Sequence, residues 1–218
     1  MKIDKAYNSW AGSYDISENK TRDLEKISAQ NVLSRYEFHN VLELGCGTGK
    51  NTEWIAEKAE STIALDFSDE MLAKAKKKIN SDKIIFCKAD LNRKWNISDH
   101  SVDLISCSLT LEHIQNLNFI FMEARDKLKA NGLFFICELH PFKQYAGSKA
   151  RFDVGEKTIE LQVFTHHVSD YMDAASKNAF NLRELKEWFD DSDRLEIPRL
   201  ISFVFEKNRL ASSGGSRK

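Results

Sequence analysis

Short apolar runs alternate with segments of helical periodicity from about residue 40 onward, and this alternation limits the folds open to the chain. The runs are NVLEL (40–44), TIALD (62–66), KIIFCKA (83–89), VDLISCS (102–108) and GLFFICEL (132–139). Between them, the segments 71–79 and 117–128 carry apolar residues on one helical face. Because parallel strands are joined by a long crossover, usually a helix, the pattern predicts an α/β fold with a mainly parallel sheet.

The alternation stops after the fifth run. Residues 140–180, rich in Tyr, Phe and His, are predicted to form an irregular insertion over the edge of the sheet. A helix opened by Asn181 is then expected to carry Leu182, Leu185 and Phe189 on one side.

The end of the chain contains two further β-like runs, RLEIPRL (194–200) and ISFVFEK (201–207), joined too closely for a crossover. They predict an antiparallel close and raise the expected strand number to seven. We expect one domain over residues 1–210 that begins with helices within 1–36, and a flexible tail at 211–218.

Composition excludes several classes of protein. The chain has 218 residues, 42% of them hydrophobic and 30% charged, and 32 Lys and Arg balance 33 Asp and Glu. A strongly basic protein whose main role is to coat nucleic acid is therefore excluded. The first residues lack the apolar stretch of a secretory signal and no run of about 18 uncharged apolar residues occurs, so we expect a cytoplasmic protein without a membrane partner. Four widely spaced cysteines without a CxxC pair favour reduced thiols and no zinc site.

The most informative segment is the glycine loop, Gly45-Cys46-Gly47-Thr48-Gly49, which follows the first apolar run and precedes a helical pattern. At the carboxyl end of a parallel strand, glycine lets the backbone approach a ligand, and the next helix presents free N–H groups. Asp66 ends the second run, 21 residues after Gly45. An acid at this position accepts hydrogen bonds from ribose hydroxyls, so we expect a ligand that contains a ribose.

The loop reads GxGxG rather than GxGxxG, and Glu43 precedes it where a pyrophosphate site would avoid an anion. A carboxylate there suits a cationic group such as an amine or a sulfonium. Two alternatives stay open: the glycines form only a tight turn beside a solvent-facing Glu43, or the ligand is a dinucleotide.

These residues resemble the class I S-adenosylmethionine-dependent methyltransferases, in particular the small-molecule branch with an N-terminal aromatic lid. ELGCGTG is similar to their first motif. The resemblance continues in Tyr7…Trp10…Tyr14-Asp15, Asp66-Phe67-Ser68 with Met71, Ala89-Asp90-Leu91, Val102-Asp103-Leu104 through His113, and KLKANGLF. It implies a Rossmann-like three-layer sandwich with a seven-stranded, mainly parallel sheet, an N-terminal helical lid, S-adenosylmethionine as cofactor and S-adenosylhomocysteine as product.

The resemblance also implies which residues bind the cofactor. They are Tyr14, Glu43, Gly45, Cys46, Gly47, Asp66, Phe67, Met71, Asp90, Leu91, Ser106 and Ser108. The glycine loop would contact the methionine part, Asp66 the ribose, and the residues after the second and third strands the adenine. Phe67 and Met71 could instead be ordinary core residues, and Asp90 could simply form a turn.

The acceptor side is less defined. Methyl transfer from a sulfonium is an in-line displacement in which positioning supplies most of the rate, so a general base is optional. His113 and His140 are the candidate bases, each with a structural role as the alternative. The predicted substrate-binding residues are Tyr7, Trp10, Tyr145, His166, His167 and Tyr171. No metal site is expected from these histidines.

We therefore predict an S-adenosylmethionine-dependent methyltransferase that acts on an O, N or C nucleophile of a small molecule, as a monomer or homodimer. The insertion at 140–180 favours a small acceptor over a macromolecule. Two other functions stay open: a relative that binds the cofactor without transferring methyl, and a protein or nucleic-acid methyltransferase. The balanced charge and the lack of a basic stripe disfavour nucleic acid as a partner.

Overall fold

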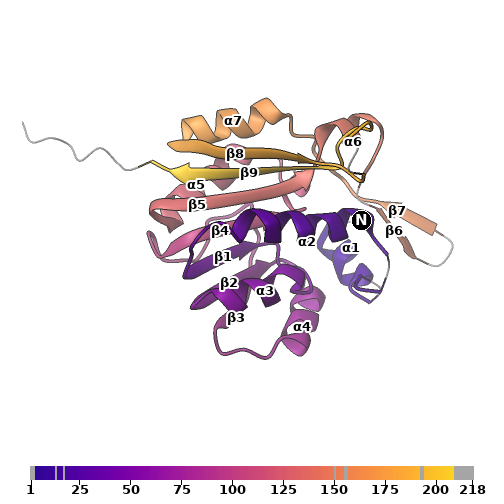
Figure 1. Ribbon diagram of the computed structural model, residues 1–218. Helices are drawn as coiled ribbons and strands as arrows, with labels where there is room; N and C mark the ends of the chain where they lie inside the picture. Colours follow the sequence, from indigo (N-terminus) through magenta and orange to yellow (C-terminus); the bar gives the residue numbers. More distant parts are fainter. Residues whose placement is uncertain are drawn as a thin grey trace, which may run out of the picture.

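The computed structural model describes residues 3–12, 14–16, 18–149, 151–154, 157–191 and 194–208, and a seven-stranded sheet forms its centre (Figure 1). The strand order is β3-β2-β1-β4-β5-β9-β8. The bounds are β1 Asn40–Leu44, β2 Ser61–Asp66, β3 Ile84–Lys88, β4 Val102–Ser108, β5 Leu128–Leu139, β8 Phe180–Trp188 and β9 Leu200–Lys207. Strands β1 to β5 pair in parallel, whereas β9 is antiparallel to both β5 and β8. The predicted α/β architecture with seven mainly parallel strands is confirmed.

Helices cover both faces of the sheet, because the central strands are apolar on both sides. On one face, α2 (Lys20–Leu33) and α3 (Lys50–Lys58) pack on alternate strand residues such as Val41 and Phe135. On the other, α5 (Leu117–Lys127) and α7 (Val168–Lys177) pack on the residues between, such as Leu42 and Phe134. Helix α4 (Asp69–Lys78) contacts β2 and β3. The result is a three-layer sandwich.

The crossovers bring the carboxyl ends of β1, β2 and β4 to one edge of the sheet. The loops after these strands and the short helix η1 (Leu111–His113) lie there, beside α1 (Ile3–Trp10) at the start of the chain. At the opposite end of β4, Asp103 accepts hydrogen bonds from the backbone N–H groups of His39 and Asn40. Asp103 therefore has the structural role expected at the amino end of a strand.

The helix predicted over 181–189 is wrong, because β8 occupies this segment. Leu182 and Leu185 have helical spacing, but they stay 37% and 40% exposed at the edge of the sheet. The register of β8 on β9 shifts between Leu182 and Glu184, which interrupts the two-residue alternation that identifies a strand in sequence. Pairing with the buried β9 overrides the local pattern.

The prediction of two antiparallel strands at the end of the chain is also partly wrong. Only 200–207 forms a strand, and its antiparallel partners are β5 and β8 rather than 194–200. The insertion at 140–180 is more regular than predicted. It contains α6 (Pro141–Tyr145), an antiparallel pair formed by β6 (Arg151–Val154) and β7 (Lys157–Glu160), and the core helix α7. The predicted tail at 211–218 lies outside the described residues.

Helices α1 and α2 lie where N-terminal helices were expected, but they have different surroundings. Helix α2 packs on β5 and β9 as part of the sandwich, whereas α1 contacts α4 beside the loops of the sheet edge. All four cysteines are free, and Cys46, Cys107 and Cys137 are buried. Among the described helices, none has the length and apolarity needed to cross a membrane.

Candidate active site

A cavity of about 830 Å³, here called the large cavity, opens at the carboxyl ends of β1, β2 and β4. The glycine loop, the turn after β2, residues 88–93 and residues 108–110 line it, and α1 contributes Tyr7 and Asn8. This edge is where parallel sheets bind ligands, since the connecting loops separate there. The predicted cofactor residues from three distant parts of the sequence are thus brought together.

The glycine loop needs its glycines for two different reasons. Gly45 and Gly47 have φ of +71° and +53°, in the left-handed region that favours glycine. A Cβ on Gly45 would lie 2.1 Å from Thr110 Oγ1, whereas a Cβ on Gly47 would meet no atom within 4 Å. Gly45 is therefore required for packing against the loop after β4, and Gly47 leaves its space to the large cavity.

Asp66 holds this loop from the end of β2. Its Oδ2 accepts a hydrogen bond of 2.8 Å from the Gly47 N–H, and its Oδ1 accepts one of 2.8 Å from the Ser68 N–H. Burial raises the pKa of Asp66, while these N–H groups oppose the rise. The carboxylate faces the large cavity in the position predicted for binding a ribose.

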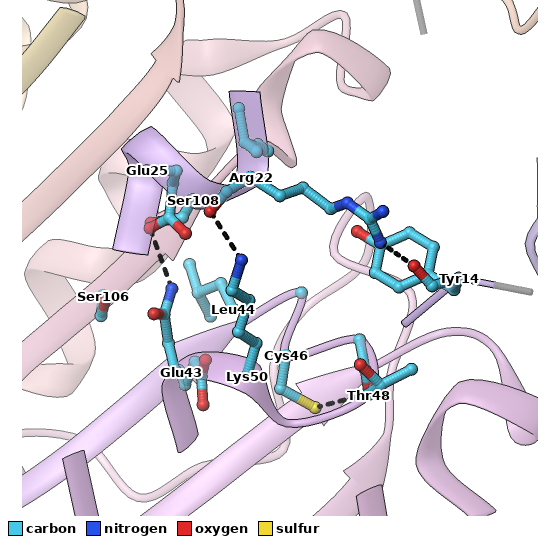
Figure 2. A pocket seen from close by; sticks show the side chains of 14 residues that line it. Tyr14, Arg22, Glu25, Glu43, Leu44, Cys46, Thr48, Lys50, Ser106 and Ser108 are labelled. Atoms are coloured by element: carbon cyan, nitrogen blue, oxygen red, sulfur yellow. Dashed lines mark hydrogen bonds between the residues drawn. The ribbon is translucent and has the colours of Figure 1, made fainter. Parts of the chain in front are cut away.

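A second, small cavity of about 50 Å³ adjoins the glycine loop on the side of α2, and Figure 2 shows its lining. Glu43 is buried there and accepts a hydrogen bond of 2.5 Å from Thr52 Oγ1. Burial raises its pKa to about 8. A solvent-facing Glu43 is therefore excluded, and its burial near a second acid, Glu25, creates a site that a cation would stabilise.

Arg22 from α2 spans the mouth of the small cavity (Figure 2). Its guanidinium lies 4.2 Å from the centre of the Tyr14 ring and donates a hydrogen bond to the Tyr14 carbonyl. Glu25, also on α2, accepts a hydrogen bond of 2.9 Å from Asn51 Nδ2. Arg22 and Glu25 lie on a helix without a recognisable sequence motif, so no local pattern indicated that they belong to the site.

All but one of the predicted cofactor residues line one or both of the two cavities. Glu43, Cys46 and Ser106 line the small cavity, Asp66, Phe67, Asp90 and Leu91 line the large one, and Tyr14, Gly45, Gly47 and Ser108 line both. Met71 lines neither and is buried at the start of α4, where Ser68 Oγ accepts its N–H. Asp90 also accepts the Asn92 N–H, so it has the turn role as well as a place in the cavity wall.

A third cavity, of about 600 Å³, lies on the other side of Tyr7, Tyr14 and Leu109, and these three residues line both it and the large cavity. We call it the acceptor-side cavity. Trp10, one of the predicted substrate-binding residues, lines it together with residues from the start of α2, the end of α6 and the segment before β9. Two cavities of ligand size therefore share one wall.

The two candidate bases have different surroundings. His113 lines the large cavity, and its Nε2 lies 2.7 Å from the Tyr7 hydroxyl. Its Nδ1 lies 3.3 Å from the Gln162 carbonyl, so a proton on Nδ1 lets Nε2 accept from Tyr7. Burial lowers the pKa of His113. A neutral His113 that fixes Tyr7 is consistent with all three observations.

His140 lies outside the linings of the three cavities. It is 1% exposed, its Nδ1 accepts the Phe142 N–H at the start of α6, and its Nε2 lies 3.1 Å from Glu187. Both ring nitrogens are thus occupied by the turn and by β8. Its surroundings are those of the structural alternative.

Four predicted acceptor residues also lie outside the three cavity linings. Tyr171 is buried and stacks on Phe203 in the core, with ring centres 4.9 Å apart. His166 is buried, with Nε2 2.7 Å from the Ile114 carbonyl. Tyr145 is 54% exposed, and its hydroxyl contacts His167. At these positions the aromatic-rich insertion thus supplies core packing, at Tyr171 and His166, or exposed surface, at Tyr145 and His167, rather than cavity wall.

Glu112 is a site residue that the sequence analysis missed. It lies in η1, is buried, lines the acceptor-side cavity and accepts a hydrogen bond of 3.4 Å from Gln144 Nε2. Burial raises its pKa to about 7. The only sequence signal was its position beside His113, because nothing local indicates that a glutamate will be buried. Within the described residues, no cluster of three or more His, Cys, Asp or Glu is placed to hold a metal ion.

Residues 42–136, which contain the glycine loop, Asp66 and Glu112, match the family model described as a methyltransferase domain. The fold is shared with solved methyltransferases. A putative S-adenosylmethionine-dependent methyltransferase from Listeria monocytogenes superposes with a TM-score of 0.73 at 20% identity, covering 86% of this chain and 100% of that one. Residues 42–136 thus resemble a methyltransferase domain, and the chain has the fold of S-adenosylmethionine-dependent methyltransferases.

The proteins to which this chain is similar are diverse. The chain is 33% identical over 129 residues to trans-aconitate 2-methyltransferase of Rhizobium rhizogenes, which covers 58% of this chain and 48% of that protein. It is 30% identical over 141 residues to malonyl-[acyl-carrier protein] O-methyltransferase of Bacillus cytotoxicus, covering 60% and 47%. The aligned part thus spans about half the length of these two relatives. The DhpI–SAH complex superposes with a TM-score of 0.75 at 17% identity, covering 95% and 96% of the two chains.

Proposed function

We propose that this chain transfers the methyl group of S-adenosylmethionine to a nucleophile on a small molecule. One observation carries the proposal: the large cavity and the acceptor-side cavity meet at Tyr7, Tyr14 and Leu109. A donor in the first and an acceptor in the second would face each other across this junction. Holding two reactants in line at about 3–3.5 Å supplies much of the rate of such a transfer.

The residues present fit the cofactor. Asp66 offers its carboxylate to the ribose, and the open space beside Gly47 admits a ligand against the backbone. Phe67, Asp90 and Leu91 line the part of the large cavity assigned to the adenine. When bound, the sulfonium supplies a methyl group that is already activated for displacement.

The small cavity suits the amino acid end of the cofactor. Glu43 and Glu25 would pair with its ammonium group, and the Arg22 guanidinium would pair with its carboxylate. Burial of Glu43 keeps it protonated up to about pH 8 without a ligand. A cation bound beside Glu43 lowers the pKa of its carboxyl group. We therefore expect cofactor binding to release a proton from Glu43 at neutral pH.

Glu112 is the candidate general base in place of the two histidines. Its pKa of about 7 lets it accept a proton near neutral pH, and it lines the cavity assigned to the acceptor. When an acceptor loses a proton on being methylated, Glu112 would accept that proton. An acceptor that is already deprotonated needs no such step.

Helix α1 is the candidate lid. Tyr7 contacts His113, and Asn8 Oδ1 accepts a hydrogen bond of 2.6 Å from Ser68 Oγ at the start of α4. These contacts hold α1 against the large cavity, and their release would open a path for the cofactor. Closure would then exclude water from the reacting atoms.

The first experiment is calorimetric titration with S-adenosylmethionine and, separately, S-adenosylhomocysteine. We expect micromolar binding of both, and Asp66→Ala is expected to weaken it by about 1–3 kcal/mol through loss of charge-assisted hydrogen bonds. Glu57→Gln, on the exposed surface of α3, is the control and should bind as the wild type does. No binding of either compound would refute the cofactor assignment.

The second experiment separates transfer from binding alone. Incubation with S-adenosylmethionine labelled in its methyl group is expected to label small molecules from a metabolite extract. Label that enters only protein or nucleic acid would favour a macromolecular acceptor. Tight binding without any transfer would favour a relative that uses the cofactor without transferring its methyl group.

A further inference from the structure

The acceptor-side cavity is lined by cations from three segments that are far apart in the sequence. Lys20 and Arg22 lie at the start of α2, Lys149 follows α6, and Arg199 precedes β9. The acidic residues in the same lining are Glu18 and Glu112. Burial raises the pKa of Glu112 to about 7, so near neutral pH it carries only part of a negative charge. The wall of the cavity is therefore positive.

Two of these cations, Arg199 and Arg22, already have other partners. Arg199 makes a two-point contact with Asp190 and donates a hydrogen bond of 3.1 Å to Thr21 Oγ1, which ties α2 to the sheet. Arg22 contacts Tyr14 at the border with the small cavity, where we assign it to the methionine carboxylate. Asp190 neutralises Arg199, and Arg22 adds positive charge to the wall without being the first contact of an acceptor.

Lys20 and Lys149 are the cations available to an acceptor. Lys20 is exposed and forms no ion pair with the residues that the structure describes. Lys149 lies 3.3 Å from Glu160, but the two side chains are 50% and 58% exposed. An exposed pair of this kind is weak, so Lys149 can exchange Glu160 for a ligand.

The opposite wall is different. Tyr7, Trp10 and Tyr14 form an aromatic border toward the large cavity, with the Tyr7 and Trp10 ring centres 5.7 Å apart and those of Trp10 and Tyr14 4.8 Å apart. Tyr7 and Tyr14 also line the large cavity assigned to the donor, whereas Lys20 and Lys149 do not. We call the part of the wall formed by Tyr7, Trp10 and Tyr14 the aromatic end, and the Arg22 guanidinium lies against it, 4.2 Å from the centre of the Tyr14 ring.

We propose, on the basis of the proposed function, that the acceptor is a small organic anion. Lys20 and Lys149 hold its anionic group, and its nucleophile lies at the aromatic end beside Tyr7 and Tyr14. The volume of about 600 Å³ is in the range of sites for small molecules. Carboxylates and phosphate-type groups share the chemistry that these two lysines recognise.

The test uses the full chain saturated with S-adenosylhomocysteine, so that the donor side is occupied. Calorimetry compares three sets of probes: the carboxylates glutarate and tricarballylate, the phosphate-type anions methylphosphonate and glycerol 3-phosphate, and the uncharged analogues glutaramide and glycerol. At least one of the two anionic sets is expected to bind, more weakly as salt is added, and the uncharged set is not. Which anionic set binds identifies the source of the charge.

Two variants locate the binding. The double variant Lys20→Gln, Lys149→Gln is expected to weaken anion binding by about tenfold or more, because two charge-assisted contacts are lost. Lys77→Gln on the exposed side of α4 is the matched control and is expected to leave binding unchanged. S-adenosylhomocysteine binding is measured in the wild type and in every variant. Its absence in the wild type would refute the proposed function rather than this inference, and unchanged binding in the variants shows that the donor side is intact.

Three results would overturn the proposal while S-adenosylhomocysteine still binds. Uncharged analogues binding as tightly as the anions would show that charge is not recognised. Equal anion affinities of the double variant and the wild type would show that the two lysines are not involved. Absence of binding by all four anions would show that the positive wall does not select small organic anions.

Discussion

Alanine at Gly45 and alanine at Gly47 are expected to damage this protein in different ways. Both glycines have positive φ, so alanine at either position costs about 1–2 kcal/mol of backbone strain. At Gly45, the added Cβ would also lie 2.1 Å from Thr110 Oγ1 and 2.8 Å from its Cγ2. Thr110 has little freedom to yield, because its hydroxyl donates to the Ser108 carbonyl and its N–H donates to Glu138.

This second contact sets the size of the difference. Overpacking of this kind adds about 1–3 kcal/mol, so Gly45→Ala is expected to be about 2 kcal/mol less stable than Gly47→Ala. For a chain of this length, the difference lowers the melting temperature by about 4–8 °C. The Cβ of Gly47→Ala enters the large cavity instead, so its main effect should be weaker binding of S-adenosylhomocysteine.

Thermal unfolding and calorimetric titration measure the two effects separately. Adding Thr110→Ala to Gly45→Ala removes Oγ1 and Cγ2 and is expected to restore part of the lost stability, as a double-mutant cycle would show. Equal melting temperatures for Gly45→Ala and Gly47→Ala, or no rescue by Thr110→Ala, would refute the packing role assigned to Gly45.

Three further outcomes are expected. Burial raises the pKa of Glu138 to about 8, so the native state binds more protons than the unfolded state between about pH 4.5 and 8, and the free energy of unfolding falls as pH rises through this window. Glu138→Gln should flatten this dependence in denaturant titrations at several pH values, while Glu57→Gln should not. Once an acceptor with an ionisable nucleophile is known, Glu112→Gln should lower kcat and remove a rise in rate centred near pH 7, and an unchanged pH profile would exclude Glu112 as the base. Tyr7→Phe removes the hydrogen bond to His113, worth about 1 kcal/mol, and should make α1 more sensitive to limited proteolysis; unchanged cleavage would contradict the lid.

Much of the cofactor side could be predicted because its signals are local. The order strand, glycine loop, helix and acid places Gly45, Gly47 and Asp66 at one sheet edge by topology alone, since parallel strands end together. The acceptor side could not be predicted in the same way. Lys20, Glu112 and Lys149 meet in one cavity only after three segments have folded, and none belongs to a motif.

The candidate histidines also show that sequence alone does not tell which side chains line a cavity. A histidine after a strand looks identical in sequence whether it lines a cavity, as His113 does, or caps a helix in the interior, as His140 does. The fate of 180–188 also depended on distant residues, because an edge strand gains its stability from β9 and leaves its own outer face polar.

The sequence by itself determined the α/β class, the parallel strands β1 to β5, the glycine loop and the acid that faces it. These depend on periodicity and on backbone conformations that only certain residues adopt. Only the tertiary structure decided which charges are buried, which side chains line the two adjoining cavities and how the last strands pair. Burial, pKa and cavity shape arise from contacts between residues far apart in the chain, and no local pattern encodes them.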